Sequence, residues 1–196
     1  MNFYRLSTIG NMDDEGLVVL DHSPVGIGAH YSRLRGGKSV KDYYPENAVV
    51  HMSEDREGLK LASLIGSTES YLILHKDVKA IIESRIGNDN IEYFPFTLLN
   101  HKNKPHTGDY FFINPLTIMD CLDTKASQVK YWRDTDKVID IGEYILDTQK
   151  VENAPAIFRV KEHVSSYIIS EELVNDFIQA GFTNLIMTKL KYSDDT

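Results

Sequence analysis

The chain of 196 residues contains a single cysteine, Cys121, and only six prolines. One thiol cannot form an internal disulfide framework or a thiolate-rich zinc site. No stretch approaches eighteen consecutive apolar residues, so we expect no transmembrane helix. Residues 1–5 lead into polar residues and not into an apolar stretch, so we expect no secretory signal. These absences favour a protein of a reducing cytoplasm.

Basic residues are too few to balance the acidic ones, 21 against 29, and the formal net charge is −8. Direct nucleic-acid binding is disfavoured because neutralising phosphates needs a basic face. A basic protein partner is the natural complement of an acidic surface. Residues 120–152 hold eight acidic and five basic residues, so the acidity leans toward the C-terminal half. Such charge also occurs where it only keeps a protein soluble.

Short segments of apolar, β-branched and aromatic residues predict β-strands. The expected strands are residues 3–6, 17–20, 71–74, 91–99, 110–113, 128–132, 139–146, 157–160, 167–169 and 185–190. Residues 21–47 are rich in glycine and proline with little periodicity, which predicts a long loop or at most a weakly regular segment. Residues 100–109 predict the connection of a β-hairpin. Pro95 indicates an edge position or a bulge in its strand.

Two segments show the periodicity of amphipathic helices. The first covers about residues 76–86, and Gly87 is a candidate C-cap. The second covers about residues 170–180 and begins with Ser170, a good N-cap. Its apolar stripe is formed by Leu173, Val174, Phe177 and Ile178.

Each helix lies between two predicted strands, so a strand–helix–strand unit occurs at residues 71–99 and again at residues 167–190. We therefore predict an α+β fold with mixed, largely antiparallel sheets. Residues 1–43 are expected to contribute N-terminal strands and a loop, and residues 44–192 an α+β domain. We expect these two parts to form one compact unit.

The segment Gly36-Gly37-Lys38-Ser39 is similar to the end of a phosphate-binding loop. That loop needs a further glycine five positions before Gly37, where this chain has Ser32. No clear strand leads into the segment either. A flexible basic loop is the better interpretation, and nothing else in the chain predicts a cofactor.

A small metal-dependent hydrolase is the alternative that residue chemistry leaves open, with His101, His106, Asp120 and Asp123 as its functional groups. His101, His106 and Asp109 fall in the expected hairpin loop, where ligands are not held rigidly. Asp120 and Asp123 fit better as residues that end a packed segment and cap the next turn. We therefore favour a protein without catalytic, cofactor or metal residues.

Several short motifs follow one another at characteristic spacings between residues 44 and 190. They are Asn100-His101, residues 110–116, Asp120-Cys121-Leu122-Asp123 with Ser127, and residues 157–159, 170–173 and 180–185. In this set the chain resembles a family of bacterial immunity proteins from polymorphic toxin systems. Residues 1–43 match poorly, and His75 stands where a serine is more usual.

The resemblance implies a cytoplasmic antidote of interbacterial competition that binds a cognate toxin protein, encoded by the adjacent gene, and performs no catalysis. The acidic balance suits a basic target such as a nuclease. A general interaction module unrelated to toxins is a third possibility. Acidic residues expected at the surface are the candidates for toxin binding: Asp13, Asp14, Glu15, Asp134, Asp136 and Asp140.

Overall fold

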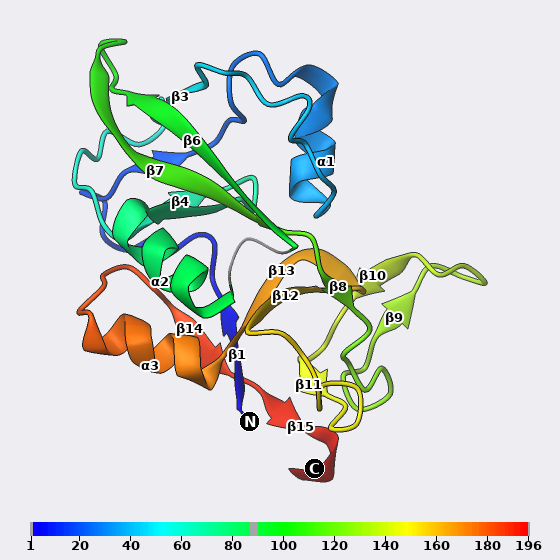
Figure 1. Ribbon diagram of the computed structural model, residues 1–196. Helices are drawn as coiled ribbons and strands as arrows, with labels where there is room; N and C mark the ends of the chain where they lie inside the picture. The colour runs from blue at the N-terminus through cyan, green and yellow to red at the C-terminus, as the bar shows by residue number, and fades with distance from the viewer. Residues whose placement is uncertain (1, 87–89, 196) are drawn as a thin grey trace.

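A computed structural model describes residues 2–86 and 90–195 of the chain (Figure 1). The fold is α+β with largely antiparallel sheets, which confirms the predicted class. The α-helices are α1 (Tyr31–Arg35), α2 (Lys76–Ile86) and α3 (Glu171–Gln179), and the short 3-10 helices are η1 (Gly28–His30) and η2 (Ser193–Asp195).

The upper part of the molecule in Figure 1 is a six-stranded sheet. Its order is β2 (Val19–Leu20), β4 (Leu64–Ser67), β5 (Leu72–His75), β7 (Pro105–Pro115), β6 (Ile91–Leu99) and β3 (Val49–His51). The two edges nearly meet just after β3. The Met52 amide donates to the Leu99 carbonyl of β6, and the Ser53 amide donates to the Val19 carbonyl of β2. The sheet is therefore a nearly closed barrel, which leaves little unpaired edge.

The lower part is a five-stranded sheet accompanied by two small strand pairs. Its order is β14 (Met187–Lys189), β1 (Phe3–Leu6), β13 (His163–Ser170), β12 (Ile157–Val160) and β8 (Ile118–Met119). The pairs are β9 (Lys130–Tyr131) with β10 (Val138–Asp140), and β11 (Ile145–Leu146) with β15 (Lys191–Tyr192).

The two strand–helix–strand units have the same topology. Helix α2 connects β5 to β6, and both strands pair antiparallel with β7, which lies between them. Helix α3 connects β13 to β14 in the same way around β1. The helices lie side by side (Figure 1), and the Arg85 guanidinium binds both carboxylate oxygens of Asp176 at 2.6 and 2.8 Å. One supersecondary unit is thus used twice, as the sequence pattern indicates.

Strands β5 and β7 are buried on both faces because two cores lie on opposite sides of the barrel wall. Tyr110 and Phe112 of β7 point into the barrel, while Phe111 and Ile113 face α2, α3 and the lower sheet. This alternation explains the unbroken aromatic run in the sequence. A third core lies around Phe158, on the other face of the lower sheet.

Several predicted boundaries are wrong. Residues 139–146 form two strands, β10 and β11, because the amides of Gly142 and Glu143 both donate to the Ser127 carbonyl and turn the chain. Ile178 is 65% exposed and lies outside the packed stripe of α3. The β6–β7 hairpin connection covers only residues 100–104, because β7 begins at Pro105.

The segment 21–47 is more regular than a loop, since it contains η1 and α1 and buries Ile27, Leu34 and Val40 in the barrel core. Pro95 lies where β6 has no β3 partner, and its carbonyl accepts a hydrogen bond from Tyr44. Gly87, the predicted C-cap of the first helix, lies outside the described residues.

Candidate functional site

A fully buried arginine, Arg159 of β12, joins the two sheets. Its Nε donates to the Pro115 carbonyl at 2.9 Å, and its Nη2 donates to Oδ1 of Asn114 at 2.9 Å. The remaining N–H groups donate to the carbonyls of Leu34, Arg35 and Val164. A guanidinium has five N–H donors, and each therefore has an acceptor here.

The acceptors of Arg159 are neutral groups, so the charge is stabilised by dipoles. Two of them are C-terminal carbonyls of α1, which carry partial negative charge. The guanidinium also lies over the Tyr167 ring, with Cζ 4.3 Å from the centroid. Desolvation lowers the pKa of Arg159, but an arginine begins so high that it stays charged. We call Arg159 and its acceptors the buried junction.

Gly37, from the segment similar to a phosphate-binding loop, packs directly against this junction. Its φ is +66°, and a Cβ built on it would lie 2.6 Å from Cδ of Arg159. Glycine is therefore needed here for its backbone conformation and for the close approach of the arginine. Gly36 and Gly37 end α1 and leave room for Arg159, so the fold explains these two glycines without a bound phosphate.

Other motif residues also hold the scaffold together. The Ser127 hydroxyl donates to the Ile145 carbonyl and accepts from the Ile145 amide, both at 3.1 Å. Ser170 caps α3 by accepting from the Leu173 amide, as predicted. The Asn184 side chain joins two segments that are distant in sequence. Its Oδ1 accepts a hydrogen bond from the Asn11 amide, and its Nδ2 donates to the Leu64 carbonyl.

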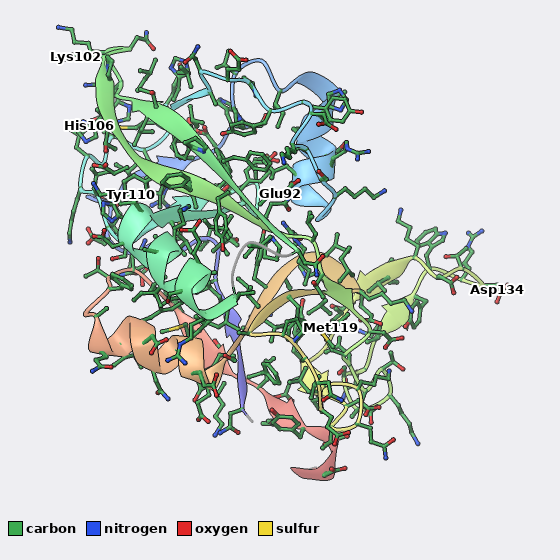
Figure 2. The ribbon with its side chains drawn as sticks, viewed as in Figure 1. Glu92, Lys102, His106, Tyr110, Met119 and Asp134 are labelled. Carbon is green, nitrogen blue, oxygen red and sulfur yellow. The ribbon has the colours of Figure 1, made fainter. Side chains whose placement is uncertain are left out.

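The four residues of the hydrolase alternative are not brought together. His106 lies on β7, far in Figure 2 from Met119, the neighbour of Asp120. Asp120 is engaged by Lys150 at 2.7 Å and Lys161 at 3.2 Å, and the Lys150 hydrogen bond lowers the pKa of Asp120. Asp123 caps the following turn. Across residues 2–86 and 90–195, no three His, Cys, Asp or Glu side chains gather as metal ligands would.

Cys121 is completely buried in the third core. Burial raises the pKa of its thiol to about 12. The thiolate is the reactive form of cysteine, so this side chain is inert at neutral pH.

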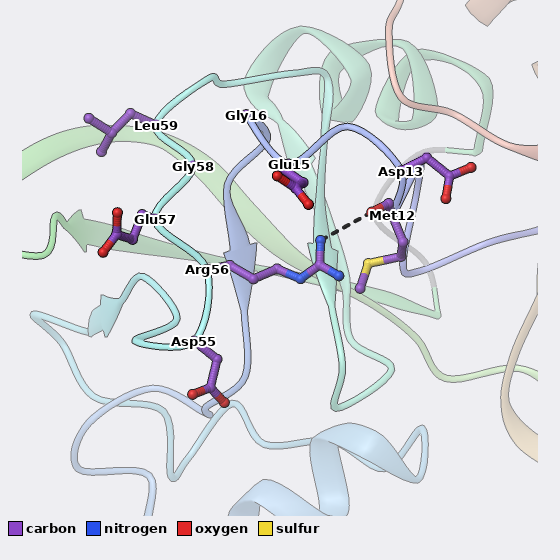
Figure 3. Close-up of a pocket in the computed structure, with 9 residues that line it drawn as sticks. All are labelled: Met12, Asp13, Glu15, Gly16, Asp55, Arg56, Glu57, Gly58 and Leu59. Carbon is purple, nitrogen blue, oxygen red and sulfur yellow. Dashed lines mark hydrogen bonds between the residues drawn. The ribbon is translucent and has the colours of Figure 1, made fainter.

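The predicted residues Asp13, Asp14 and Glu15 lie in the first of two neighbouring loops, residues 12–16 and 54–60. Figure 3 shows Asp13 and Glu15 among the residues of these loops that line a pocket. The Lys60 amide donates to the Gly16 carbonyl, and the Val18 amide donates to the Lys60 carbonyl. A Cβ on Gly58 would lie 2.3 Å from a backbone oxygen of Leu17, so only glycine permits this approach. The loops border a groove of about 950 Å³, which we call the acidic groove.

The two loops carry six carboxylates and two cations: Asp13, Asp14, Glu15, Glu54, Asp55 and Glu57, with Arg56 and Lys60. Four of the carboxylates, Asp13, Glu15, Asp55 and Glu57, line the acidic groove. Lys60 binds Asp14 at 2.8 Å, and this hydrogen bond lowers the pKa of Asp14. Arg56 donates to the Met12 carbonyl (Figure 3). The other five carboxylates have no ion pair within the described chain, and Leu59 beside them is 54% exposed.

Asp134, Asp136 and Asp140 lie elsewhere, on the β9–β10 hairpin, which projects from the body of the molecule with Asp134 at its tip (Figure 2). Asp140 is paired with Lys130 at 2.8 Å, which lowers the pKa of Asp140. The hairpin lines a different pocket, with no residue in common with the acidic groove. The six predicted residues therefore form two separate surfaces.

Each surface also contains residues that the sequence pattern does not identify. The charge run at residues 54–57 was a usable signal for the second loop of the acidic groove, but its position beside residues 12–16 depends on tertiary pairing. On the hairpin, Trp132 is 51% exposed and Ile139 is 55% exposed. Exposed aromatic side chains are frequent anchors in protein interfaces.

Every helix in the described part of the chain is too short or too polar to cross a bilayer. A comparison with curated proteins finds no match. The chain does match a family, described as "Immunity protein family (Imm11)", over residues 10–191. The match includes most of the N-terminal segment before residue 44, which is joined to the rest through Arg159. Since it covers nearly the whole chain, the protein belongs to this family of immunity proteins.

Proposed function

We propose that this protein is the cytoplasmic antidote to a cognate toxin of a polymorphic toxin system, encoded by the adjacent gene, and that it binds the toxin domain and blocks its action. Membership of an immunity protein family over residues 10–191 carries the proposal. Binding alone is enough for this role, and no catalytic step or cofactor is invoked. Neither nucleic acid nor membrane is a direct partner in this proposal.

The acidic groove supports a basic target, such as a nuclease with a cleft for nucleic acid. Its unpaired carboxylates can occupy the positions that phosphates take in such a cleft. Like charges gathered on rigid, hydrogen-bonded loops also steer a basic partner and accelerate its capture. The Leu59 side chain adds an exposed apolar contact at the edge of this charge (Figure 3).

Co-expression tests the proposal directly. The toxin domain of the adjacent gene is induced in a bacterial host with and without this chain, and growth is measured. We expect growth to be restored only with the chain present and the two proteins to co-purify. A toxin from an unrelated family, induced at the same level, is the control and should kill in both cases. Continued killing by the adjacent toxin despite soluble antidote contradicts the proposal.

The same experiment separates the competing hypotheses. A hydrolase would lose its effect after alanine substitution of His101, His106, Asp120 and Asp123, whereas an antidote that acts by binding should keep protecting as long as it folds. A general interaction module would co-purify with housekeeping proteins and give no protection. Identifying the macromolecule that the toxin degrades then tests the nuclease assignment.

A further inference from the structure

A second concave surface lies between the β9–β10 hairpin and the turn that joins β12 to β13. This cleft has a volume of about 500 Å³. Tyr131 and Val138, which pair across the hairpin, contribute its apolar lining, and Lys161 and Glu162 line it from the turn. We call it the hairpin cleft. A site of this kind can hold the aliphatic stem and the charged head of one long side chain.

The charges that line the hairpin cleft leave it negative. Three carboxylates contribute, those of Asp134, Asp136 and Glu162, and none of them forms an ion pair within residues 2–86 and 90–195. Lys161 forms an ion pair with Asp120, which is not part of the lining, and its Nζ lies 3.2 Å from Oδ2 of that residue. The cleft thus offers carboxylates without an ion pair in the described chain, and Glu162 is near enough to Lys150 and Lys161 to raise the pKa of both.

The other basic residue of the lining, Arg133, lies over the exposed Trp132 ring, with Cζ 5.4 Å from the centroid.

Glu162 gives an independent indication of a missing partner. Its Oε2 is buried and accepts no hydrogen bond in the described part of the chain. A desolvated carboxylate oxygen without a donor destabilises the free protein, and a cation that binds the Glu162 carboxylate would offset part of this cost.

We propose that the hairpin cleft receives an arginine side chain of the toxin. Its stem packs on Val138 and Tyr131, its guanidinium can lie over the Tyr131 ring, and its N–H groups donate to Glu162 and to the carboxylates at the hairpin tip. Arginine suits the site better than lysine, because a planar guanidinium can bind a carboxylate through two hydrogen bonds. The identity of the partner rests on the proposed function, but the preference for a guanidinium does not.

The hairpin supplies its own control. Asp140 and Lys130 pair on the strands outside the cleft lining, at 2.8 Å. Asp140→Asn therefore removes the same charge from the same hairpin without changing the cleft. Glu162→Gln keeps the size of the side chain at the cleft and removes its charge.

The test uses a blocked arginine tripeptide as the probe, titrated into the ¹⁵N-labelled full-length protein and followed by NMR. We expect saturable shifts of the amides of residues 131–138 and 161–162. The neutral citrulline tripeptide should bind about tenfold more weakly, and Glu162→Gln should weaken the arginine peptide by about the same factor. Asp140→Asn should leave its affinity unchanged, and the dispersion of each spectrum shows that the variant is folded.

Shifts confined to the acidic groove, equal binding of the citrulline peptide, or no saturable shifts overturn the proposal. A second measurement uses the toxin of the adjacent gene, with Glu162→Gln expected to raise its dissociation rate about tenfold and Glu152→Gln, which lies in neither lining, to leave it unchanged. If the wild-type protein does not bind that toxin, the proposed function fails while the peptide result still decides the chemistry of the cleft. If the toxin binds but Glu162→Gln has no effect on its dissociation, the cleft proposal fails alone.

Discussion

The buried junction around Arg159 and the exposed acidic groove are opposite in nearly every respect. The junction contains the motif residues Arg159, Asn114 and Pro115, and each N–H donor of its central cation has an acceptor. The acidic groove contains none of those motifs, and the four carboxylates that line it have no ion pair in the described chain. These motif residues therefore build the scaffold, and the two acidic surfaces lie outside the motifs.

The two regions differ in what a substitution should change. A buried acceptor that loses its donor costs about 1–3 kcal/mol, whereas an exposed charge contributes at most about 1 kcal/mol to folding. An exposed charge does affect the approach of a charged partner. Variants of the junction should thus lose stability without losing affinity in the folded fraction, and variants of the groove should do the reverse.

The largest effect is expected from Arg159→Ala. The substitution leaves a cavity and deprives carbonyls of α1, β7 and Val164 of their donor, so we expect the free energy of unfolding to fall by about 3–5 kcal/mol. Urea denaturation followed by circular dichroism measures it. Arg35→Ala is the control, because that side chain is exposed and forms only a 3.4 Å ion pair with Glu69. A loss below about 1 kcal/mol for Arg159→Ala would contradict the role of the junction.

Gly37→Ala should have the next largest effect, a loss of about 2–3 kcal/mol. The new Cβ meets Arg159 while the backbone keeps φ at +66°. Gly181→Ala is a matched control, because Gly181 has φ +70° and a Cβ added to it would meet nothing within 4 Å. That variant should lose only the cost of the left-handed backbone, about 1 kcal/mol. Equal losses in the two variants would show that contact with Arg159 is unimportant.

On the other side of the comparison, reversing the charge of Asp13 and Glu15 together should slow association with the toxin about tenfold at low salt. The effect should shrink as salt is added, because exposed charges are screened. Stopped-flow association at several salt concentrations measures it. The free energy of unfolding should change by no more than about 0.5 kcal/mol.

The control for charge reversal is a pair of acidic residues away from both surfaces, Glu152 and Glu172, changed to lysine together. Both variants alter the net charge by the same amount, so a difference between them reports the position of the charge. Equal association rates for the two variants would remove the acidic groove from the toxin interface.

Much of the scaffold could be predicted because its signals are local. Ser170 and the periodicity after it predict α3, and the paired strand–helix–strand pattern predicts the repeated unit. The buried junction could not be predicted, because Arg159 and Leu34 are 125 positions apart and only the fold brings them together. A buried arginine in an apolar strand also has no distinctive local pattern.

The candidate site could be predicted less completely for the same reason. Acidic turns can be recognised as exposed, which identifies Asp13 and Asp134, but their grouping into two surfaces depends on the fold. No local signal indicates that residues 54–57 lie beside residues 12–16. The exposure of Trp132 is also hidden, since a tryptophan next to a strand is usually buried.

The smallest effect is expected at Asp120, which lies outside both regions and sets the scale for exposed ion pairs. Hydrogen bonds from Lys150 and Lys161 lower its pKa from the ordinary value of 3.8. The folded state therefore holds the carboxylate ionised at a pH where the unfolded chain binds a proton. This contribution to stability is complete above the unfolded pKa and is lost as the pH falls through the lower pKa of the folded state.

Asp120→Asn should remove this contribution. Stability at neutral pH should then fall by less than about 1 kcal/mol, and the decline of stability below pH of about 4 should become shallower. Urea unfolding of both proteins between neutral and acidic pH measures the difference. Parallel curves would mean that the two lysines do not hold Asp120 in solution.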